Sequence, residues 1–175
     1  MEKEKAKNLH IEQWVQGDKK NIEELKGNPI LIEFFQLNCP GCFLYGIPEA
    51  IKFYKLYSSK GLKVIGVSTA FEDFDKNNLE NLKLLINENK VIGAPKLILK
   101  EKGLVEEDGV LPFKIPFPVG MDEITEINGF KIGKTFYEYG LQGTPSAVLI
   151  DKEGFIAHKV FGYHPNLEDM IKELL

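Results

Sequence analysis

The segment "EFFQLNCPGCFLYGIP" (residues 33–48) holds both cysteines of this chain, Cys39 and Cys42, with two residues between them. It overlaps "PILIEFF" (29–35), which is apolar on both faces apart from one acid. That pattern is typical of a central strand covered by helices on both sides. Apolar side chains then recur at helical spacing over 40–58. The cysteine pair is therefore expected where a buried strand meets a helix.

The surrounding segments extend this strand and helix into an α/β pattern. "LKVIGVS" (62–68) is predicted to be a second buried strand. Because strand, helix and strand follow within about forty residues, the two strands should be parallel. The other predicted elements are a strand over 9–15, helices over 77–89, 94–101 and 133–140, an antiparallel hairpin of "SAVLID" and "FIAHKVF", and a last helix, "LEDMIKELL", capped by Asn166.

Composition narrows the function classes. The 175 residues carry 22 basic and 26 acidic side chains, a formal net charge of −4, without the clustered basic face expected of a nucleic-acid-binding protein. No apolar run is long enough to span a bilayer, and residues 1–30 show no secretory signal. We therefore expect a protein without a membrane span that is cytoplasmic, or extracytoplasmic if a leader has been removed. Its single domain covers 1–175, with a flexible charged tail over 1–8 and an insert of uncertain structure over about 90–118.

The position of Cys39 favours redox chemistry. A sulfur at a helix N-terminus meets unpaired N–H groups and the positive end of the helix dipole, and both stabilise the nucleophilic thiolate. Pro40 can occupy the first helical position because no N–H is needed there. Cys42 lies one turn further on, should be more buried, and can close a small disulfide ring. Cys39 is thus expected to attack and Cys42 to resolve the mixed disulfide.

Two other uses of the cysteine pair remain open. A zinc site would need two further ligands, and the chain offers only His10, His158 and His164, with no second cysteine pair. The pair could also be idle, as in a binding adaptor. A close cysteine pair between a strand and a helix is more typical of a redox site than of either alternative. No cofactor and no metal are expected.

Two motifs resemble the thioredoxin superfamily. "ILIEFFQLNCPGC" is similar to its active-site strand and helix, and "GTPSAVLIDKEGFIAHKVFGY" is similar to its later hairpin, which begins with a cis-proline. The long middle segment and "FPVGMD" look more like the TlpA-like and peroxiredoxin-related (AhpC–TSA-like) branch. The resemblance covers about 9–175, less the insert. It implies a thioredoxin fold, with a central mixed sheet flanked by helices, an N-terminal extension and a central insert.

The resemblance also implies roles for individual residues. Cys39 would be the exposed nucleophile and Cys42 the resolving thiol, facing a cis-proline at Pro145. The backbone of Thr144 would pair with an extended substrate chain. Glu33 would be a buried acid whose raised pKa lets it take the proton from Cys42, unless it reaches water or pairs with a lysine. The implied partners are a protein disulfide or dithiol as substrate and a second redox protein.

Other positions depart from the family pattern. Asn38 stands where the family usually carries tryptophan, which changes the surface beside the nucleophile. The dipeptide between the cysteines, Pro40–Gly41, reverses the usual order, so the direction of electron flow stays open. We expect Asn38, Pro40 and Gly41 to contact the substrate. Pro48, one position later than is usual in thioredoxin, should kink the helix.

The peroxiredoxin branch supplies the main alternative function, a thiol-dependent peroxidase. Its reactive cysteine follows a proline and a threonine in the pattern P-x-x-x-T-x-x-C. Ile32 and Gln36 occupy those two positions here. The threonine that would position peroxide is missing, so thiol–disulfide exchange is the preferred function.

Overall fold

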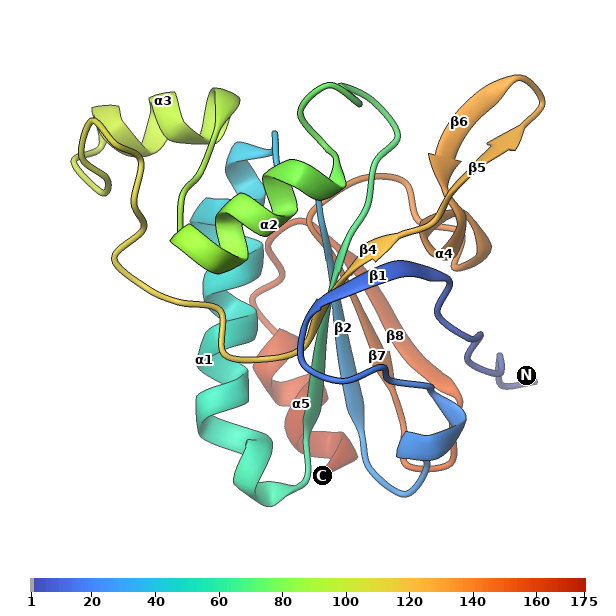
Figure 1. Ribbon diagram of the computed structural model, residues 1–175. Helices are drawn as coiled ribbons and strands as arrows, with labels where there is room; N and C mark the ends of the chain where they lie inside the picture. Colours follow the sequence, from blue (N-terminus) through green and yellow to red (C-terminus); the bar gives the residue numbers. More distant parts are fainter. Residues whose placement is uncertain (1) are drawn as a thin grey trace.

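The computed structural model describes residues 2–175. Its elements are β1 (Ile11–Gln16), η1 (Glu23–Leu25), β2 (Ile30–Phe35), η2 (Cys42–Gly46), α1 (Ile47–Tyr57), η3 (Ser58–Lys60), β3 (Lys63–Ser68), α2 (Leu79–Glu88), α3 (Gly93–Glu101), β4 (Val119–Asp122), β5 (Ile124–Ile127), β6 (Phe130–Gly133), α4 (Lys134–Glu138), β7 (Ser146–Ile150), β8 (Ile156–Phe161) and α5 (Leu167–Leu174). Six strands form one mixed sheet in the order β1-β4-β3-β2-β7-β8 (Figure 1). As predicted, β2 and β3 are parallel and β7 and β8 form an antiparallel hairpin.

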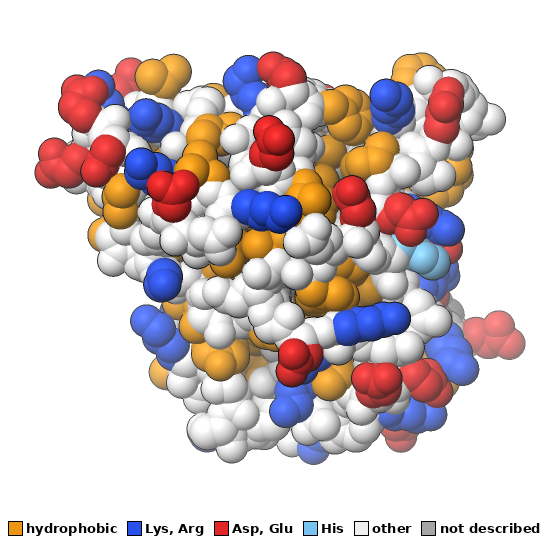
Figure 2. Space-filling view, in the orientation of Figure 1, with side chains coloured by type: hydrophobic (Ala, Val, Ile, Leu, Met, Phe, Trp, Pro, Cys, Tyr) orange, Lys and Arg blue, Asp and Glu red, His pale blue; other side chains and the backbone are white. Residues whose placement is uncertain are grey.

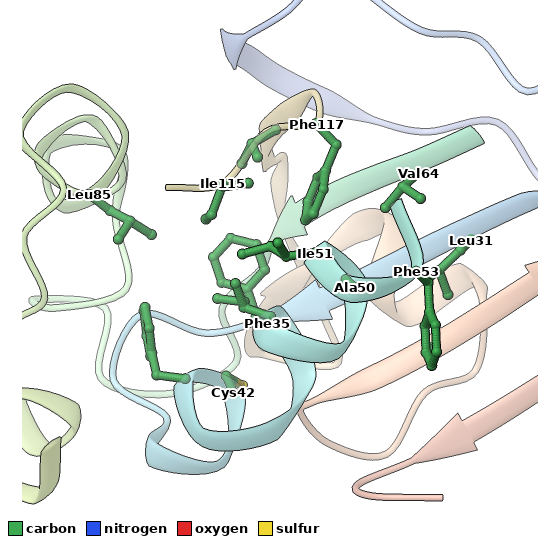
Figure 3. Close-up of a cluster of buried hydrophobic side chains, with 14 of the residues drawn as sticks. Leu31, Phe35, Cys42, Ala50, Ile51, Phe53, Val64, Leu85, Ile115 and Phe117 are labelled. Atoms are coloured by element: carbon green, nitrogen blue, oxygen red, sulfur yellow. The ribbon is translucent and has the colours of Figure 1, made fainter. Parts of the chain in front are cut away.

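Strand β2 is the centre of the sheet because both of its faces are covered. All six of its residues are buried. Leu31 and Phe35 join the core under α1, α2 and α5, whereas Ile32 and Phe34 join a second core under α4. Figure 3 shows Phe35 in the first core, beside Ile51 of α1. The two cores confirm that helices cover both faces of β2. The cysteine loop leaves from the buried end of this strand, after Phe35.

Three short strands were not predicted. β4 has only four residues, "VGMD", and its glycine hides the strand pattern. β5 and β6 form a separate hairpin that projects from the sheet (Figure 1). Its turn, Asn128–Gly129, has φ angles of 51° and 83°. That dipeptide is a strong hairpin signal and could have revealed the element.

The second half of the expected insert belongs to the core. A helix was predicted near 94–101 and is present as α3. The following chain returns past Lys90, which forms a bridge with Val110. Ile115 and Phe117 then bury their side chains against Phe35 in the first core (Figure 3). This proline-rich segment has no periodic pattern in its sequence, although Leu111, Ile115 and Phe117 are buried.

The segment expected to be a flexible tail over 1–8 makes hydrogen bonds in the part that is described. The N–H of Ile156 donates to the carbonyl of Glu4, and the N–H of Ala6 donates to the carbonyl of Gly154. The hydroxyl of Tyr139 donates to the carbonyl of Lys7 over 2.6 Å. β8 is an edge strand with unpaired backbone groups, so a charged segment can dock there through its backbone. Met1 lies outside the described residues.

The helix after the cysteines is irregular where Pro48 was expected to kink it. Helical geometry begins at Pro40, passes through a π-helical turn, η2, and continues as α1. The N–H of Ile47 reaches back to the carbonyl of Cys42, five residues earlier, just before the proline. At the other end of the chain, Asn166 precedes α5 but makes no side-chain capping bond, so that prediction was wrong.

The visible surface carries both signs of charge. Figure 2 shows lysines interspersed with acids over this face of the molecule. Within residues 2–175, no helix has the length and apolar character needed to cross a membrane.

Candidate active site

The two cysteines form a disulfide at the start of the helix that leads into α1. Their Cα atoms are 5.3 Å apart. Cys42 is fully buried and Cys39 is partly exposed, so only one sulfur faces solvent. The N–H of Cys42 donates to Cys39 Sγ over 3.3 Å. This contact favours negative charge on the outer sulfur when the pair is reduced.

The second wall of the site is the loop before β7. The Thr144–Pro145 peptide bond is cis, as the resemblance implied. Cys39 Sγ lies 3.6 Å from the carbonyl oxygen of Thr144. A side chain at Gly41 would lie 3.6 Å from Pro145 Cδ. The two motifs, which are about a hundred residues apart in sequence, meet because β7 pairs with β2 in antiparallel register.

Glu33 lies on the inner side of the same helix turn. It is 3% exposed and sits in β2 between Gly66 of β3 and Ala147 of β7. A methyl group at Gly46, one turn after Cys42, would collide with Glu33 Oε1 and with Pro145 Cβ. Burial, together with the charge of Glu49, raises the pKa of the Glu33 carboxyl well above 4.5. The carboxyl is therefore packed below the cysteine-bearing turn and holds its proton more tightly than an exposed glutamate.

An open depression of about 370 Å³ surrounds the outer sulfur. The predicted residues Asn38, Cys39, Pro40 and Thr144 all line it. The lining residues that sequence reasoning missed are Gln36, Phe71, Glu72, Gln142, Gly143 and Phe161. They come from three separate loops and the end of β8. Gln36, Gly143 and Phe161 lie within the two recognised motifs, whereas no local motif marks Phe71, Glu72 or Gln142. Two aromatic rings beside Cys39 give the depression apolar contact surface.

Asn38 joins the cysteine loop to its neighbours. Its Nδ2 donates to Asp73 Oδ2 over 2.9 Å, and its Oδ1 accepts from the N–H of Ala94 over 3.0 Å. Gly93 has a φ of 61°, and a side chain there would collide with Asn38 Oδ1. The residue that replaces the family tryptophan therefore ties α3 to the active-site loop. Asn38 is also partly exposed and lines the depression, so a substrate could contact it.

The alternative of a metal site requires several ligand side chains close together. In the part of the chain that the structure describes, residues 2–175, no three His, Cys, Asp or Glu side chains are grouped as a metal site. His10 instead pairs with Glu138, with 2.6 Å between Nε2 and Oε2.

Solved structures of known proteins share this arrangement. "Thioredoxin-like superfamily protein SPOA0173" is 31% identical, with a TM-score of 0.74, over 98% of this chain and 96% of that one. A thiol-disulfide isomerase from Corynebacterium glutamicum is 29% identical, with a TM-score of 0.73, over 97% of this chain and 95% of that one. Both match nearly the whole chain, so the thioredoxin fold extends through the insert.

Curated relatives match at lower identity and are longer. The chain is 26% identical to Protein DipZ of Mycobacterium bovis over 89% of its own length, but spans only 18% of that protein. It is 24% identical to the thiol-disulfide oxidoreductase ResA of Bacillus cereus over 85% of its own length and spans 63% of that protein. The sequence model of the AhpC/TSA family matches residues 3–159. The chain thus belongs to the AhpC/TSA family and is a TlpA-like protein of the thioredoxin superfamily.

Proposed function

We propose that this protein is a thiol–disulfide oxidoreductase that exchanges disulfides with polypeptide substrates, with Cys39 as the nucleophile. One observation carries the proposal: a disulfide-forming pair whose outer sulfur opens into a depression and faces the cis-proline loop, while its inner sulfur is fully buried. The names of ResA and of the Corynebacterium structure support the same chemistry. Only the outer sulfur can meet a disulfide that belongs to another chain.

In the reductive direction the reaction has two steps. The Cys39 thiolate attacks one sulfur of the substrate disulfide, so that an S–S bond forms to Cys39 and the other substrate sulfur leaves as a thiolate. Cys42 then loses its proton and attacks Cys39 Sγ, which releases the second substrate thiolate. The substrate gains two electrons and two protons, and the protein ends as the Cys39–Cys42 disulfide. A second redox protein must reduce that disulfide; with all steps reversed, the same site oxidises dithiols.

Glu33 is proposed as the group that receives the Cys42 proton. Because Cys42 is fully buried, its proton cannot pass directly to bulk water. The carboxyl under Gly46 lies on the inner side of the same turn, and its raised pKa brings it closer to that of a thiol. A better-matched acceptor makes proton transfer more efficient.

Thr144 is proposed to hold the substrate chain. Its carbonyl oxygen lies beside Cys39 Sγ, and its side chain lines the depression. An extended peptide that paired with the backbone there would place its own disulfide next to the outer sulfur. Asn38, Pro40 and Gly41 would contact the same peptide from the opposite wall.

The two cysteines can be tested separately. The reduced wild-type protein should reduce the disulfides of insulin, and Cys39→Ser should abolish this reaction. Cys42→Ser should instead accumulate a mixed disulfide with insulin through Cys39, measured by mass spectrometry after acid quenching. Wild-type rates in the Cys39→Ser variant, or an adduct on Cys42 in the wild-type reaction, would contradict these roles.

A further inference from the structure

A buried amide lies between the two walls of the site. Gln36 follows β2 and is 2% exposed, yet it borders the depression around Cys39. Its Oε1 accepts two hydrogen bonds over 3.1 Å, from the backbone N–H of Phe71 and from Asn77 Nδ2. Its Nε2 lies 3.5 Å from Thr144 Oγ1, at the long limit of a hydrogen bond. Gln36 therefore links the cis-proline loop to the loop after β3.

Asn77 carries this link to the other wall. It is also 2% exposed, and its Oδ1 accepts from the backbone N–H of Asn38 over 2.8 Å. Its Nδ2 donates to Gln36 and, over 2.8 Å, to the carbonyl of Glu72. The continuous path thus runs from Thr144 through two buried amides to the residue before Cys39.

Backbone donors fix which way both amides point. A backbone N–H can only donate, so the oxygen of Gln36 must face Phe71 and the oxygen of Asn77 must face Asn38. The Gln36 NH₂ group is then left for the Thr144 hydroxyl. Because buried polar groups are costly to leave unpaired, each amide resists rotation of the other.

We propose that Gln36, acting through Asn77, is a positioning residue that sets the Thr144 loop against the Cys39 loop so that a polypeptide can contact both. This inference rests on the proposed function and concerns which disulfides the site accepts. Neither amide has a hydrogen bond to Cys39 Sγ or Cys42 Sγ among the contacts of residues 2–175. Their effect on exchange must therefore pass through the placement of the two walls.

The two classes of disulfide should respond differently. A polypeptide disulfide must meet the Thr144 backbone and Cys39 Sγ at once, so it depends on the separation of the walls. A small disulfide without a peptide backbone, such as cystamine, needs only Cys39 Sγ. Misplacement of one wall by an ångström can reduce a positioned reaction about 100-fold. Loss of the amide link should accordingly slow exchange with the polypeptide and spare exchange with cystamine.

The test compares Gln36→Met and Asn77→Ala with wild type. The second-order rate constant for oxidation of the reduced protein by insulin should fall about 10- to 100-fold in each variant, while that for cystamine changes less than about 3-fold. The reduction potential of the cysteine pair should be unchanged. The control is Gln13→Met, the same exchange at an exposed position of β1, which should behave as wild type.

A double variant tests whether the two amides act as one link. If they do, Gln36→Met combined with Asn77→Ala should lose little more than either single variant. Equal losses with insulin and cystamine, unchanged insulin rates, or multiplicative losses in the double variant would overturn the proposal. If Gln36→Met does not fold, Asn77→Ala decides by the same substrate comparison. Failure of the wild-type protein to react with either disulfide would instead contradict the proposed function.

Discussion

Two buried carboxyls, Glu33 and Asp122, lie on opposite faces of the sheet and differ in their hydrogen-bond partners. Burial raises the pKa of both Glu33 and Asp122 above their ordinary values. For Asp122, hydrogen-bond donors offset part of this rise in pKa. Its Oδ1 accepts from the N–H of Thr135, and its Oδ2 accepts from the N–H of Phe136 and the hydroxyl of Thr69. For Glu33, burial and the charge of Glu49 both raise the pKa, and no hydrogen bond lowers it. The carboxyl of Asp122 joins β4 to α4 and to the loop after β3, whereas no hydrogen-bond donor lowers the pKa of Glu33.

Each carboxyl is also covered by a glycine. A methyl group at Gly46 would collide with Glu33 Oε1, and one at Gly133 would collide with Asp122 Oδ2 and Thr69 Oγ1. Both glycines have ordinary negative φ angles, so close contact and not backbone conformation restricts these positions. The molecule therefore offers matched substitutions at a proposed proton acceptor and at a structural carboxyl.

The largest difference is expected in the rate of the resolving step. Glu33→Gln removes the proposed proton acceptor, so attack by Cys42 on the mixed disulfide should slow about 100-fold at neutral pH. The first step, attack by Cys39, should be unaffected. Rapid acid quenching and thiol alkylation measure the lifetime of the mixed disulfide. Asp122→Asn is the control. If the resolving step slowed equally in both variants, Glu33 would have no special role as the proton acceptor.

Asp122→Asn should show the opposite balance. An amide offers one acceptor oxygen where the carboxylate uses two, so at least one buried donor loses its partner. We expect the free energy of unfolding to fall by about 1–3 kcal/mol, from the cost of an unpaired buried donor. Chemical denaturation measures this loss. The insulin reduction rate of the folded variant should match wild type, and a large loss of activity would show that Asp122 also serves the site.

The glycine pair sharpens the same contrast. Gly46→Ala and Gly133→Ala should each lower the free energy of unfolding by about 1–3 kcal/mol through overpacking. Only Gly46→Ala should also slow insulin reduction, because the displaced groups are Glu33 and Pro145. Denaturation and rate measurements on both variants check this. Equal activity in the two would mean that the carboxyl and the proline need no exact placement.

The smallest effect is a change in how stability depends on pH. A folded-state pKa above 4.5 means that the native protein binds the Glu33 proton more tightly than the unfolded chain does. The stabilisation that the Glu33 proton contributes is therefore greatest below pH 4.5, and it is lost as pH rises through the raised pKa. Glu33→Gln should lack this loss and gain stability relative to wild type above that range. If the difference in the free energy of unfolding between Glu33→Gln and wild type were the same at every pH, the raised pKa of Glu33 would be contradicted.

The sequence was informative where one short segment determines the surroundings. The apolar residues on both sides of "PILIEFF" predicted a covered strand and favoured a buried acid over one that reaches water, and Glu33 is buried. The cis bond before Pro145 came from the resemblance of a whole motif, since proline alone seldom adopts it. The short helix expected near 94–101 is present as α3.

The rest depended on contacts between distant segments. Asp122 gave no signal because β4 is four residues long and its hydrogen-bond partners lie in α4 and in the loop after β3. The link from Thr144 to Asn38 joins side chains more than a hundred residues apart, and nothing local distinguishes Gln36 from a surface glutamine. The tail was expected to be flexible from its charge, although backbone hydrogen bonds to an edge strand do not depend on side-chain type.

The titration of the Glu33 side-chain carboxyl in the reduced protein, followed by carbon NMR, tests the central claim most directly. We predict a midpoint well above 4.5, accompanied by a change in the Cys42 Cβ resonance at the same pH and by no change there when Asp122 titrates. A Glu33 midpoint at or below 4.5, or a raised midpoint to which Cys42 does not respond, would contradict the assignment of Glu33 as the proton acceptor of the inner thiol.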